Sequence, residues 1–154
     1  MNNQLIKKAL TSAKTIAMVG VSSPKKQKDY KITVRRPSII VMKYLQEFGY
    51  KVIPVNPFAT GDEINGEITM GKLEDIKFSI DIVNVFRPSK ETPKIAEQTV
   101  KIGAKVLWLQ YGIENEDARK IVEKENIICI QNKCIKQEYQ KLFLKVNPVF
   151  PVLQ

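Results

Sequence analysis

Short apolar runs alternate with segments of helical periodicity along most of the chain. The runs are rich in β-branched residues and bounded by polar or helix-breaking residues, which is typical of strands buried on both faces of a parallel sheet. Five such strands are predicted, at residues 16–19, 52–55, 80–86, 106–109 and 127–130. A further short strand near residues 67–70 would complete six.

The intervals between these strands have the spacing of amphipathic helices. Apolar residues of segment 41–48 fall on one helical face, and Gly49 follows where a helix-ending glycine belongs. Thr92-Pro93 is typical of an N-cap and a first helical position, in a helix that ends near Gly103. Asn115 is predicted to cap another helix, whose first turn is acidic.

Strands that alternate with helices indicate βαβ units with right-handed crossovers. We therefore predict an α/β fold, a Rossmann-like doubly wound parallel sheet of about five to six strands in the order 3-2-1-4-5-6, with helices on both faces. The length of 154 residues suits one domain over residues 1–154. Residues 1–12 are predicted to form an N-terminal helix, residues 136–144 a final helix and residues 145–154 an extended tail.

Composition excludes several classes of protein. The sequence has no histidine, which removes Ser-His-Asp and Cys-His catalysis, and its two cysteines are too few for a zinc site. No apolar run approaches the length of a membrane span, and the N-terminal residues lack the layout of a secretory signal, so a cytoplasmic location is expected. The formal charge of +9 indicates either an anionic partner or a generally basic protein.

Ligands of open α/β sheets bind outside the carboxyl ends of the strands, near the switch in strand order. The first strand runs into Gly20, which permits a tight turn and a close approach by a ligand. Ser22 and Ser23 add hydroxyl and backbone N–H groups that suit phosphate oxygens. An ordinary turn between strand and loop is the alternative interpretation.

The loop that begins at Gly20 is unusually long, because the next helix starts near Arg36-Pro37-Ser38. It carries six lysines and arginines and a single acid, Asp29. A solvated charged loop and a polyphosphate site are both consistent with this composition, and the position at the switch point favours a polyphosphate.

The sequence argues against a dinucleotide such as NAD. The fingerprint of a dinucleotide site needs three glycines after the first strand and an acid at the end of the second. Only Gly20 is present of the three, and Asn56 stands where the acid belongs. The lysine-containing phosphate loop of P-loop NTPases is absent as well.

Ten segments in a fixed order carry a resemblance to a known family, from Lys14 to about Leu142. They are Val19-Gly20-Val21-Ser22, Arg36-Pro37-Ser38, Tyr44-Leu45, Gly49-Tyr50, Ile53-Pro54-Val55-Asn56-Pro57, Gly66-Glu67, Val85-Phe86-Arg87, Ile102-Gly103-Ala104-Lys105, Trp108-Leu109-Gln110 with Gly112, and Lys133-Cys134. In these segments the chain resembles the small stand-alone CoA-binding domain proteins. The resemblance implies the CoA-binding Rossmann fold that is also found in the α subunit of succinyl-CoA synthetase.

The resemblance implies that the first loop meets the phosphates of CoA and that the ends of strands two and four flank the nucleotide. Together with the strand-end argument, it defines a set of candidate ligand contacts. These are Gly20, Val21, Ser22, Ser23, Lys25, Arg36, Ser38, Asn56, Pro57, Phe86, Arg87, Pro88, Gln110 and Gly112. The chain departs from the family pattern in two places: the loop over residues 23–35 is longer and more basic, and Lys133 replaces an arginine.

Four of the candidates have a structural alternative. Arg87 suits a bidentate phosphate contact or a surface ion pair, and Phe86 suits adenine stacking or core packing. Asn56 suits a ribose hydrogen bond or a cap on the turn at Pro57. Gln110 suits a ligand contact or a hydrogen bond to a loop backbone.

Cys134 follows the sixth strand on the ligand side of the predicted sheet. Lys133 and Lys136 beside it favour the thiolate form, so one hypothesis is that Cys134 forms a mixed disulfide with the CoA thiol or senses oxidants. A packed free thiol is the other. Cys129 lies inside a predicted strand and is expected to be inert.

The function predicted from the sequence is binding of coenzyme A or an acyl-CoA by a small non-catalytic or regulatory module. The alternatives are an NAD(P)-responsive redox-sensing module and an accessory subunit of an acyl-CoA enzyme. A nucleic-acid partner is not expected, because Tyr30 is the only aromatic residue within the basic loop. No membrane partner is expected, and a homo-oligomer remains open.

Overall fold

The computed structural model describes residues 3–23 and 37–144. Lys25, Arg36 and the predicted extended tail over residues 145–154 lie outside the described residues. The elements, in chain order, are α1 (Asn3–Ser12), β1 (Thr15–Val19), α2 (Pro37–Glu47), β2 (Lys51–Val55), β3 (Glu63–Ile64), β4 (Glu67–Ile68), η2 (Leu73–Asp75), β5 (Ile82–Val85), η3 (Ser89–Glu91), α3 (Thr92–Ile102), β6 (Val106–Leu109), α4 (Glu116–Glu123), β7 (Ile128–Ile130), α5 (Ile135–Tyr139) and the π-helical turn η4 (Gln140–Leu144).

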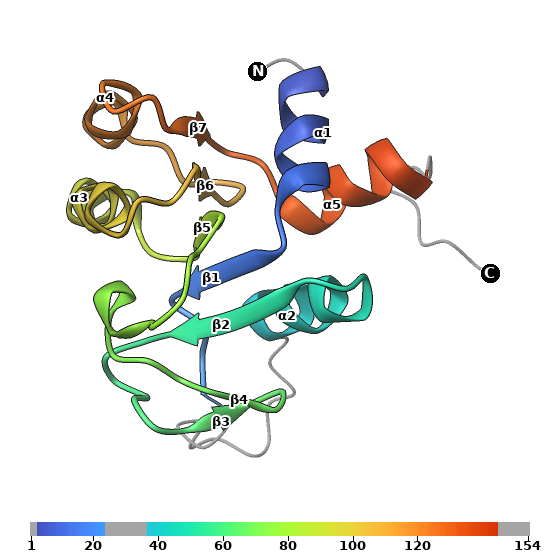
Figure 1. The fold of residues 1–154 in the computed structure, drawn as a ribbon, viewed down its shortest axis with the longest axis vertical. Helices are drawn as coiled ribbons and strands as arrows, with labels where there is room; N and C mark the ends of the chain where they lie inside the picture. The colour runs from blue at the N-terminus through green and yellow to red at the C-terminus, as the bar shows by residue number, and fades with distance from the viewer. Residues whose placement is uncertain (1–2, 24–36, 145–154) are drawn as a thin grey trace.

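A parallel sheet of five strands forms the centre of the fold, in the order β2-β1-β5-β6-β7 (Figure 1). β1 pairs with β2 on one side and with β5 on the other, so Ile16 is in register with both Val52 and Ile82. The order is that of the predicted Rossmann-like sheet without its outermost strand. The predicted α/β class is confirmed.

The prediction of an outermost parallel strand near residues 67–70 is wrong, because most of this segment does not pair with β2. Residues Glu67–Ile68 pair antiparallel with β3, and Met70 alone forms a parallel bridge to Val55 of β2. The cause is the turn at Asn65 and Gly66, which have φ values of 48° and 84°. An Asn-Gly pair with both residues in this region is the usual two-residue hairpin turn, and it pairs β4 with β3. The segment meets β2 only at Met70, whose N–H donates to the carbonyl of Pro54 and whose carbonyl accepts from the N–H of Asn56, both at 2.9 Å.

Helices cover both faces of the sheet, with α1, α2 and α5 on one side and α3 and α4 on the other (Figure 1). Because side chains alternate along a strand, β1 contributes to both cores. Ile16 and Met18 belong to the core beneath α1, α2 and α5, whereas Ala17 and Val19 belong to the core beneath α3 and α4. This burial on both faces explains why the strands are continuous apolar runs.

Two helix ends follow the prediction closely. Gly103 ends α3 with a φ of 72°, and its N–H donates to carbonyl oxygens of the last turn. The side chain of Asn115 accepts a hydrogen bond of 2.9 Å from the N–H of Ala118 at the start of α4. Both residues satisfy backbone groups that a helix end leaves without partners.

The predicted N-cap of α3 is wrong by one position. Thr92 is the first residue of α3, and Glu91 precedes it as the N-cap. The reason is the turn η3, which leads directly into the helix, so the Thr92 hydroxyl donates to the carbonyl of Ser89 at 2.6 Å. The side chain of Glu91, although it occupies the N-cap position, makes no hydrogen bond to the backbone N–H groups at the start of the helix.

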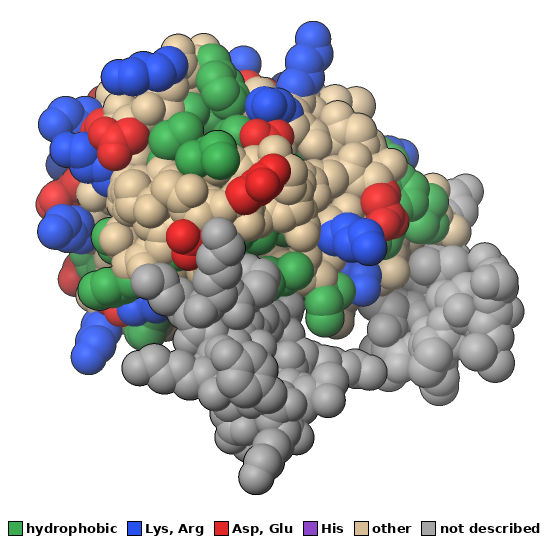
Figure 2. Space-filling model, turned by 90° about the horizontal axis from the view of Figure 1, so that it is seen from below, with side chains coloured by type: hydrophobic (Ala, Val, Ile, Leu, Met, Phe, Trp, Pro, Cys, Tyr) green, Lys and Arg blue, Asp and Glu red, His purple; other side chains and the backbone are tan. Residues whose placement is uncertain are grey.

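Among the described side chains on the face that carries β3 and β4, basic and acidic side chains are interspersed (Figure 2). Within the described part of the chain, no helix has the length and hydrophobicity needed to span a lipid bilayer.

Candidate functional site

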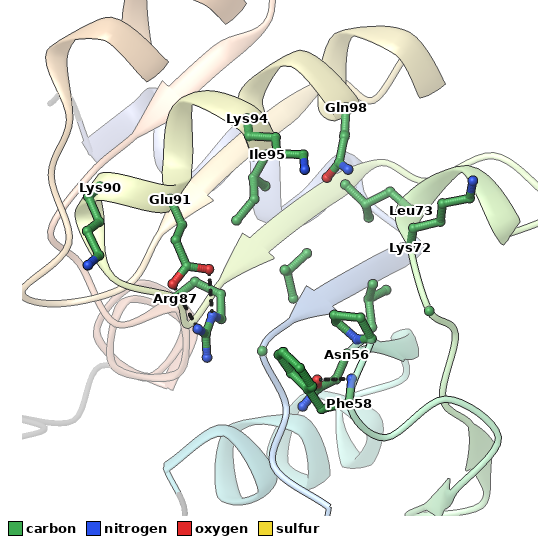
Figure 3. Close-up of a pocket in the computed structure, with 15 residues that line it drawn as sticks. Asn56, Phe58, Lys72, Leu73, Arg87, Lys90, Glu91, Lys94, Ile95 and Gln98 are labelled. Carbon is green, nitrogen blue, oxygen red and sulfur yellow. Dashed lines mark hydrogen bonds and ion pairs between the residues drawn. The ribbon is translucent and has the colours of Figure 1, made fainter.

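A cleft of about 460 Å³ lies at the carboxyl ends of β1, β2 and β5 (Figure 3). Its walls include Gly20 after β1, Asn56 after β2 and Arg87 after β5. The chain leaves β1 to form β2 on one side and β5 on the other, so this is the switch point of the sheet. A volume of this size falls in the range of pockets that hold small ligands.

Gly20 lets the loops after β1 and β5 approach each other closely. Its φ is 97°, and a β-carbon added there would lie 2.8 Å from Cδ of Arg87 and 2.9 Å from the carbonyl oxygen of Phe86. The N–H of Gly20 also donates to the carbonyl of Val55 at 2.8 Å. The sequence predicted that a ligand would approach Gly20 closely, but in the structure the side chain of Arg87 and the backbone of Phe86 make that approach, at the wall of the cleft.

Arg87 and Glu91 form a bidentate ion pair inside the cleft. Nε of Arg87 donates to Oε1 of Glu91 at 3.1 Å, and Nη2 donates to Oε2 at 2.8 Å. These hydrogen bonds from Arg87 are the main reason that the pKa of Glu91 lies below its usual value. Both side chains are about two-fifths exposed, at 39% and 40%, so the pair contributes at most about 1 kcal/mol to stability.

Three lysines add positive charge to the cleft. Lys72 follows β4, Lys90 lies in η3 and Lys94 lies in the first turn of α3 (Figure 3). Among residues 3–23 and 37–144, none of the three has an ion-pair partner. The lining therefore has an excess of cations, which suits an anionic ligand with several charges.

Asn56 connects the loops that follow β1 and β2. Its Nδ2 donates to the carbonyl of Val21 at 3.0 Å, and its Oδ1 accepts from the N–H of Phe58 at 2.9 Å. The second contact is an Asx turn, as the structural interpretation of Asn56 expected. Beside it, Pro57 lines the cleft, and the ring of Phe58 stands at its rim with 79% of its surface exposed.

The other described residues of the first loop, Val21, Ser22 and Ser23, do not line the cleft. Val21 is fully buried in the core beneath α2, and the N–H of Ser22 donates to the hydroxyl of Ser38 at 3.3 Å. Ser23 is buried, and its hydroxyl donates to Oδ2 of Asp62 at 2.7 Å. These contacts fasten the loop to α2 and to the segment before β3.

Gln110 is buried at the end of β6 and serves the interior. Its Oε1 accepts hydrogen bonds from Nδ2 of Asn84 at 3.0 Å and from the N–H of Ile135 at 2.9 Å. The side chain thereby connects β5 and β6 to the start of α5.

The remaining candidates after β5, β6 and β7 also lie away from the lining of the cleft. Phe86 packs against the core beneath α2 and α5, and Pro88 is exposed. The N–H of Gly112 donates to Oδ1 of Asn132 at 2.6 Å. Cys134 is half-buried at the start of α5 and contacts the same core as Phe86.

Cys129 is buried in β7. Burial of its thiol is the main cause that raises its pKa to about 12. The thiol form is therefore retained at neutral pH, in agreement with an inert core position.

Sequence reasoning did not include several cleft residues: Phe58, Lys72, Lys90, Glu91, Lys94 and Gln98. Lys90, Lys94 and Gln98 are spaced four residues apart, which places them on one face once η3 and α3 are known to be continuous. That spacing could have predicted that the three side chains share one face. No sequence pattern near Lys72 predicts its place in the cleft, because it reaches the cleft through the long connection between β4 and β5.

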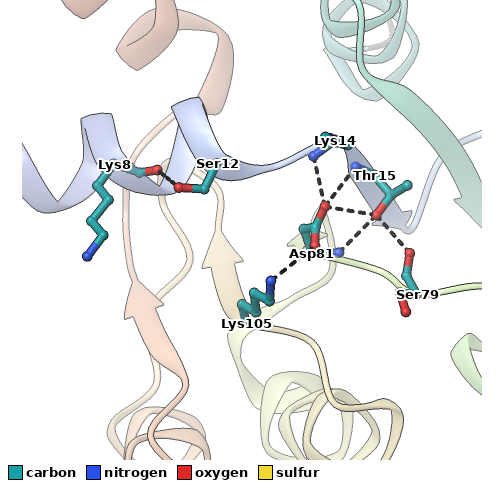
Figure 4. A network of polar contacts seen from close by, with 7 residues as sticks. All are labelled: Lys8, Ser12, Lys14, Thr15, Ser79, Asp81 and Lys105. Carbon is teal, nitrogen blue, oxygen red and sulfur yellow. Dashed lines mark hydrogen bonds and ion pairs between the residues drawn. The ribbon is translucent and has the colours of Figure 1, made fainter.

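A second, smaller cavity of about 170 Å³ lies between α1 and the amino ends of β5, β6 and β7. Beside it, Asp81 ties the starts of β1 and β5 together (Figure 4). Its Oδ2 accepts from the N–H groups of Lys14 at 2.8 Å and Thr15 at 3.2 Å. Burial of the carboxylate acts to raise the pKa of Asp81, but these hydrogen bonds and nearby Lys105 together lower it below its usual value.

We expect Asp81→Ala to reduce the free energy of unfolding by roughly 1–2 kcal/mol, because two backbone N–H groups lose their acceptor. The native pKa lies below the ordinary value of 3.8, so the stabilisation is present above about pH 4 and is lost as the pH falls through the native pKa. Urea unfolding at several pH values should show a weaker acid dependence for the variant. Glu125→Ala, which removes an exposed carboxylate, is the control, and equal losses in the two variants would contradict the role of Asp81.

The chain belongs to the CoA-binding domain family, whose family model matches residues 14–140. This match confirms the family resemblance seen in the sequence. Among residues 3–23 and 37–144, no group of three or more histidine, cysteine, aspartate or glutamate side chains is arranged to hold a metal ion.

Individual relatives agree with the family. The uncharacterized protein YneT of Bacillus subtilis (strain 168) is 39% identical over 131 residues, which cover 85% of this chain and 89% of YneT. The structure of cell-free ID.343 from Thermus thermophilus superposes with a TM-score of 0.81 at 33% identity, over 93% of this chain and 100% of that one. An ADP-forming acetate–CoA ligase of Methanocaldococcus jannaschii is 27% identical over 137 residues, which are 83% of this chain and 18% of the ligase.

Proposed function

We propose that this protein binds coenzyme A or an acyl-CoA in the cleft at the ends of β1, β2 and β5, as a binding module without chemistry of its own. The observation that carries the proposal is the cationic lining at the switch point, made by Lys72, Arg87, Lys90 and Lys94. CoA has a pyrophosphate and a 3′-phosphate, and charge-assisted contacts to phosphate are among the stronger hydrogen bonds in proteins. Membership of the CoA-binding domain family supports the same ligand.

The surroundings of the cleft suit the rest of such a ligand. The exposed ring of Phe58 at the rim offers a flat apolar surface for a base or for the pantetheine arm. Val19, Leu73 and Ile95 add apolar side chains to the lining. A lining that combines cations with apolar surface suits a nucleotide that carries a neutral arm.

A role without catalysis fits the residues that are present. The sequence has no histidine, and the only carboxylate in the described lining, that of Glu91, is held by Arg87. The match to the acetate–CoA ligase spans 18% of that enzyme, so ligation is not transferred to this chain. The protein would then act by holding CoA, or by presenting it to a partner enzyme.

Isothermal titration calorimetry with CoA, acetyl-CoA, dephospho-CoA, NAD, NADP and ATP tests the proposal. We expect CoA or acetyl-CoA to bind most tightly. The cations of the cleft favour them over NAD and dephospho-CoA, which lack the additional phosphate monoester. ATP and NADP carry comparable phosphate charge, so weaker binding of these two would show that the pantetheine arm contributes through the apolar part of the lining. In a thermal-shift assay, CoA at about 100 times its dissociation constant should stabilise the fold by ~2.7 kcal/mol.

The nucleotide panel also serves as the control. Preferential binding of NAD or NADP without binding of CoA would favour the redox-sensing alternative and would end the CoA proposal. Equal weak binding of every nucleotide would indicate attraction by charge alone.

A further inference from the structure

Glu91 is unusual within the cleft because of its charge. Among the described residues of the lining it is the only carboxylate, and it shares that lining with four cations. It is the N-cap residue of α3, yet its side chain makes no capping hydrogen bond. Its carboxylate is instead committed to the guanidinium of Arg87.

The two hydrogen bonds between these side chains use one edge of the guanidinium, the edge formed by Nε and Nη2. A bidentate contact to a phosphate requires two parallel N–H groups of the same kind. In the free protein, therefore, the carboxylate of Glu91 occupies one of the two edges at which the guanidinium can make such a contact, the other being the edge formed by Nη1 and Nη2.

The position of Arg87 does not depend on this ion pair alone. Its Cγ and Cδ lie so close to Gly20 that a β-carbon there would be 3.1 Å and 2.8 Å away from them. The aliphatic stem lies against Gly20, and the side chain as a whole is about two-fifths exposed. An exposed ion pair of this kind is weak enough for another anion to replace.

We propose that Glu91 is a built-in competitor of the ligand, whose carboxylate holds the fork of Arg87 until a phosphate group of the bound nucleotide displaces it. This inference rests on the proposed function and adds a residue that sets the affinity and selectivity of the same site. A weak anion such as a carboxylate gains nothing by exchanging with Glu91. A phosphate, which carries more charge and more acceptor oxygens, gains from the exchange.

The test is the affinity of Glu91→Gln for CoA, measured by isothermal titration calorimetry. Glutamine keeps the length of the side chain but loses the charge, so the fork of Arg87 is released while the fold is preserved. We expect CoA to bind roughly two- to fivefold more tightly, which corresponds to the strength of an exposed ion pair. Glu97→Gln, an exposed position on the same helix outside the cleft, is the matched control and should change the affinity by less than about 1.5-fold.

A double-mutant cycle with Arg87→Gln separates competition for the fork from simple charge repulsion. If Glu91 acts through Arg87, the gain from Glu91→Gln should nearly vanish in the Arg87→Gln background. A gain that persists there would show repulsion through space and would overturn the proposal. An unchanged or weaker affinity of Glu91→Gln, with normal thermal stability, would overturn it as well.

The outcomes for the two proposals can be told apart. If the wild-type chain binds no CoA, the proposed function fails and this inference fails with it. If the wild-type chain binds CoA and Glu91→Gln matches it, only the inference about Glu91 fails.

Discussion

Gly20→Ala is expected to lower the free energy of unfolding by roughly 2–4 kcal/mol. One part of the loss comes from the backbone, because a φ of 97° is costly for any residue with a β-carbon. The other part comes from contact, since the new methyl group would lie 2.9 Å from the carbonyl oxygen of Phe86 and 2.8 Å from Cδ of Arg87. The carbonyl belongs to the backbone at the end of β5 and cannot move without disturbing the sheet.

Gly49→Ala is the matched control, measured beside it by urea denaturation. Gly49 has nearly the same φ, 96°, but nothing lies within 4 Å of a β-carbon placed there. It should therefore show only the backbone part, on the order of 1 kcal/mol. Equal losses in the two variants would mean that the close approach of the β1 and β5 loops does not contribute.

Arg87→Gln is expected to weaken CoA binding by about 1.5–3 kcal/mol, or roughly 10- to 150-fold, as for the loss of a charge-assisted hydrogen bond. The substitution removes the charged planar fork that would contact a phosphate group. Calorimetric titration of the variant with CoA measures the loss directly.

Arg119→Gln is the matched control for Arg87→Gln. Arg119 lies on α4, outside the cleft, and also pairs with a glutamate four residues later, Glu123. Its side chain has a similar exposure, 35% against 39% for Arg87. If both variants lost affinity equally, Arg87 would act only through the net charge of the protein and would no longer belong to the site.

The strands and helix ends could be predicted because their signals are local. A strand buried on both faces must be apolar along its length, and the segment that became β6, Val106–Leu109, is apolar at every position. Gly103 and Asn115 satisfy unpaired backbone groups wherever a helix ends or begins. The sixth strand was predicted in the wrong form because the Asn65-Gly66 turn, also a local signal, makes Glu67–Ile68 the second strand of a hairpin, and only Met70 bridges to β2.

The site was harder to predict, as Phe86 and Arg87 illustrate. Both follow β5, but successive side chains at a strand end point to opposite faces of the sheet. Phe86 accordingly packs beneath α2 and α5, whereas Arg87 enters the cleft on the side of α3. Knowing that strand ends share one edge does not reveal toward which face each loop side chain turns.

The glycine at the end of the first strand and the acid missing after the second are features that the sequence alone determined. The order of the elements defined the Rossmann-like sheet, and the glycine and the missing acid predicted a phosphate-bearing ligand other than NAD at the carboxyl edge of that sheet. Only the tertiary structure decided that the side chain of Arg87 packs beside Gly20 and forms an ion pair with Glu91. It also decided that Lys72 and Lys94 line the same cleft. The physical reason is that burial and capping act between neighbours in the chain, whereas the partner of a charged side chain depends on which distant segments the fold brings together.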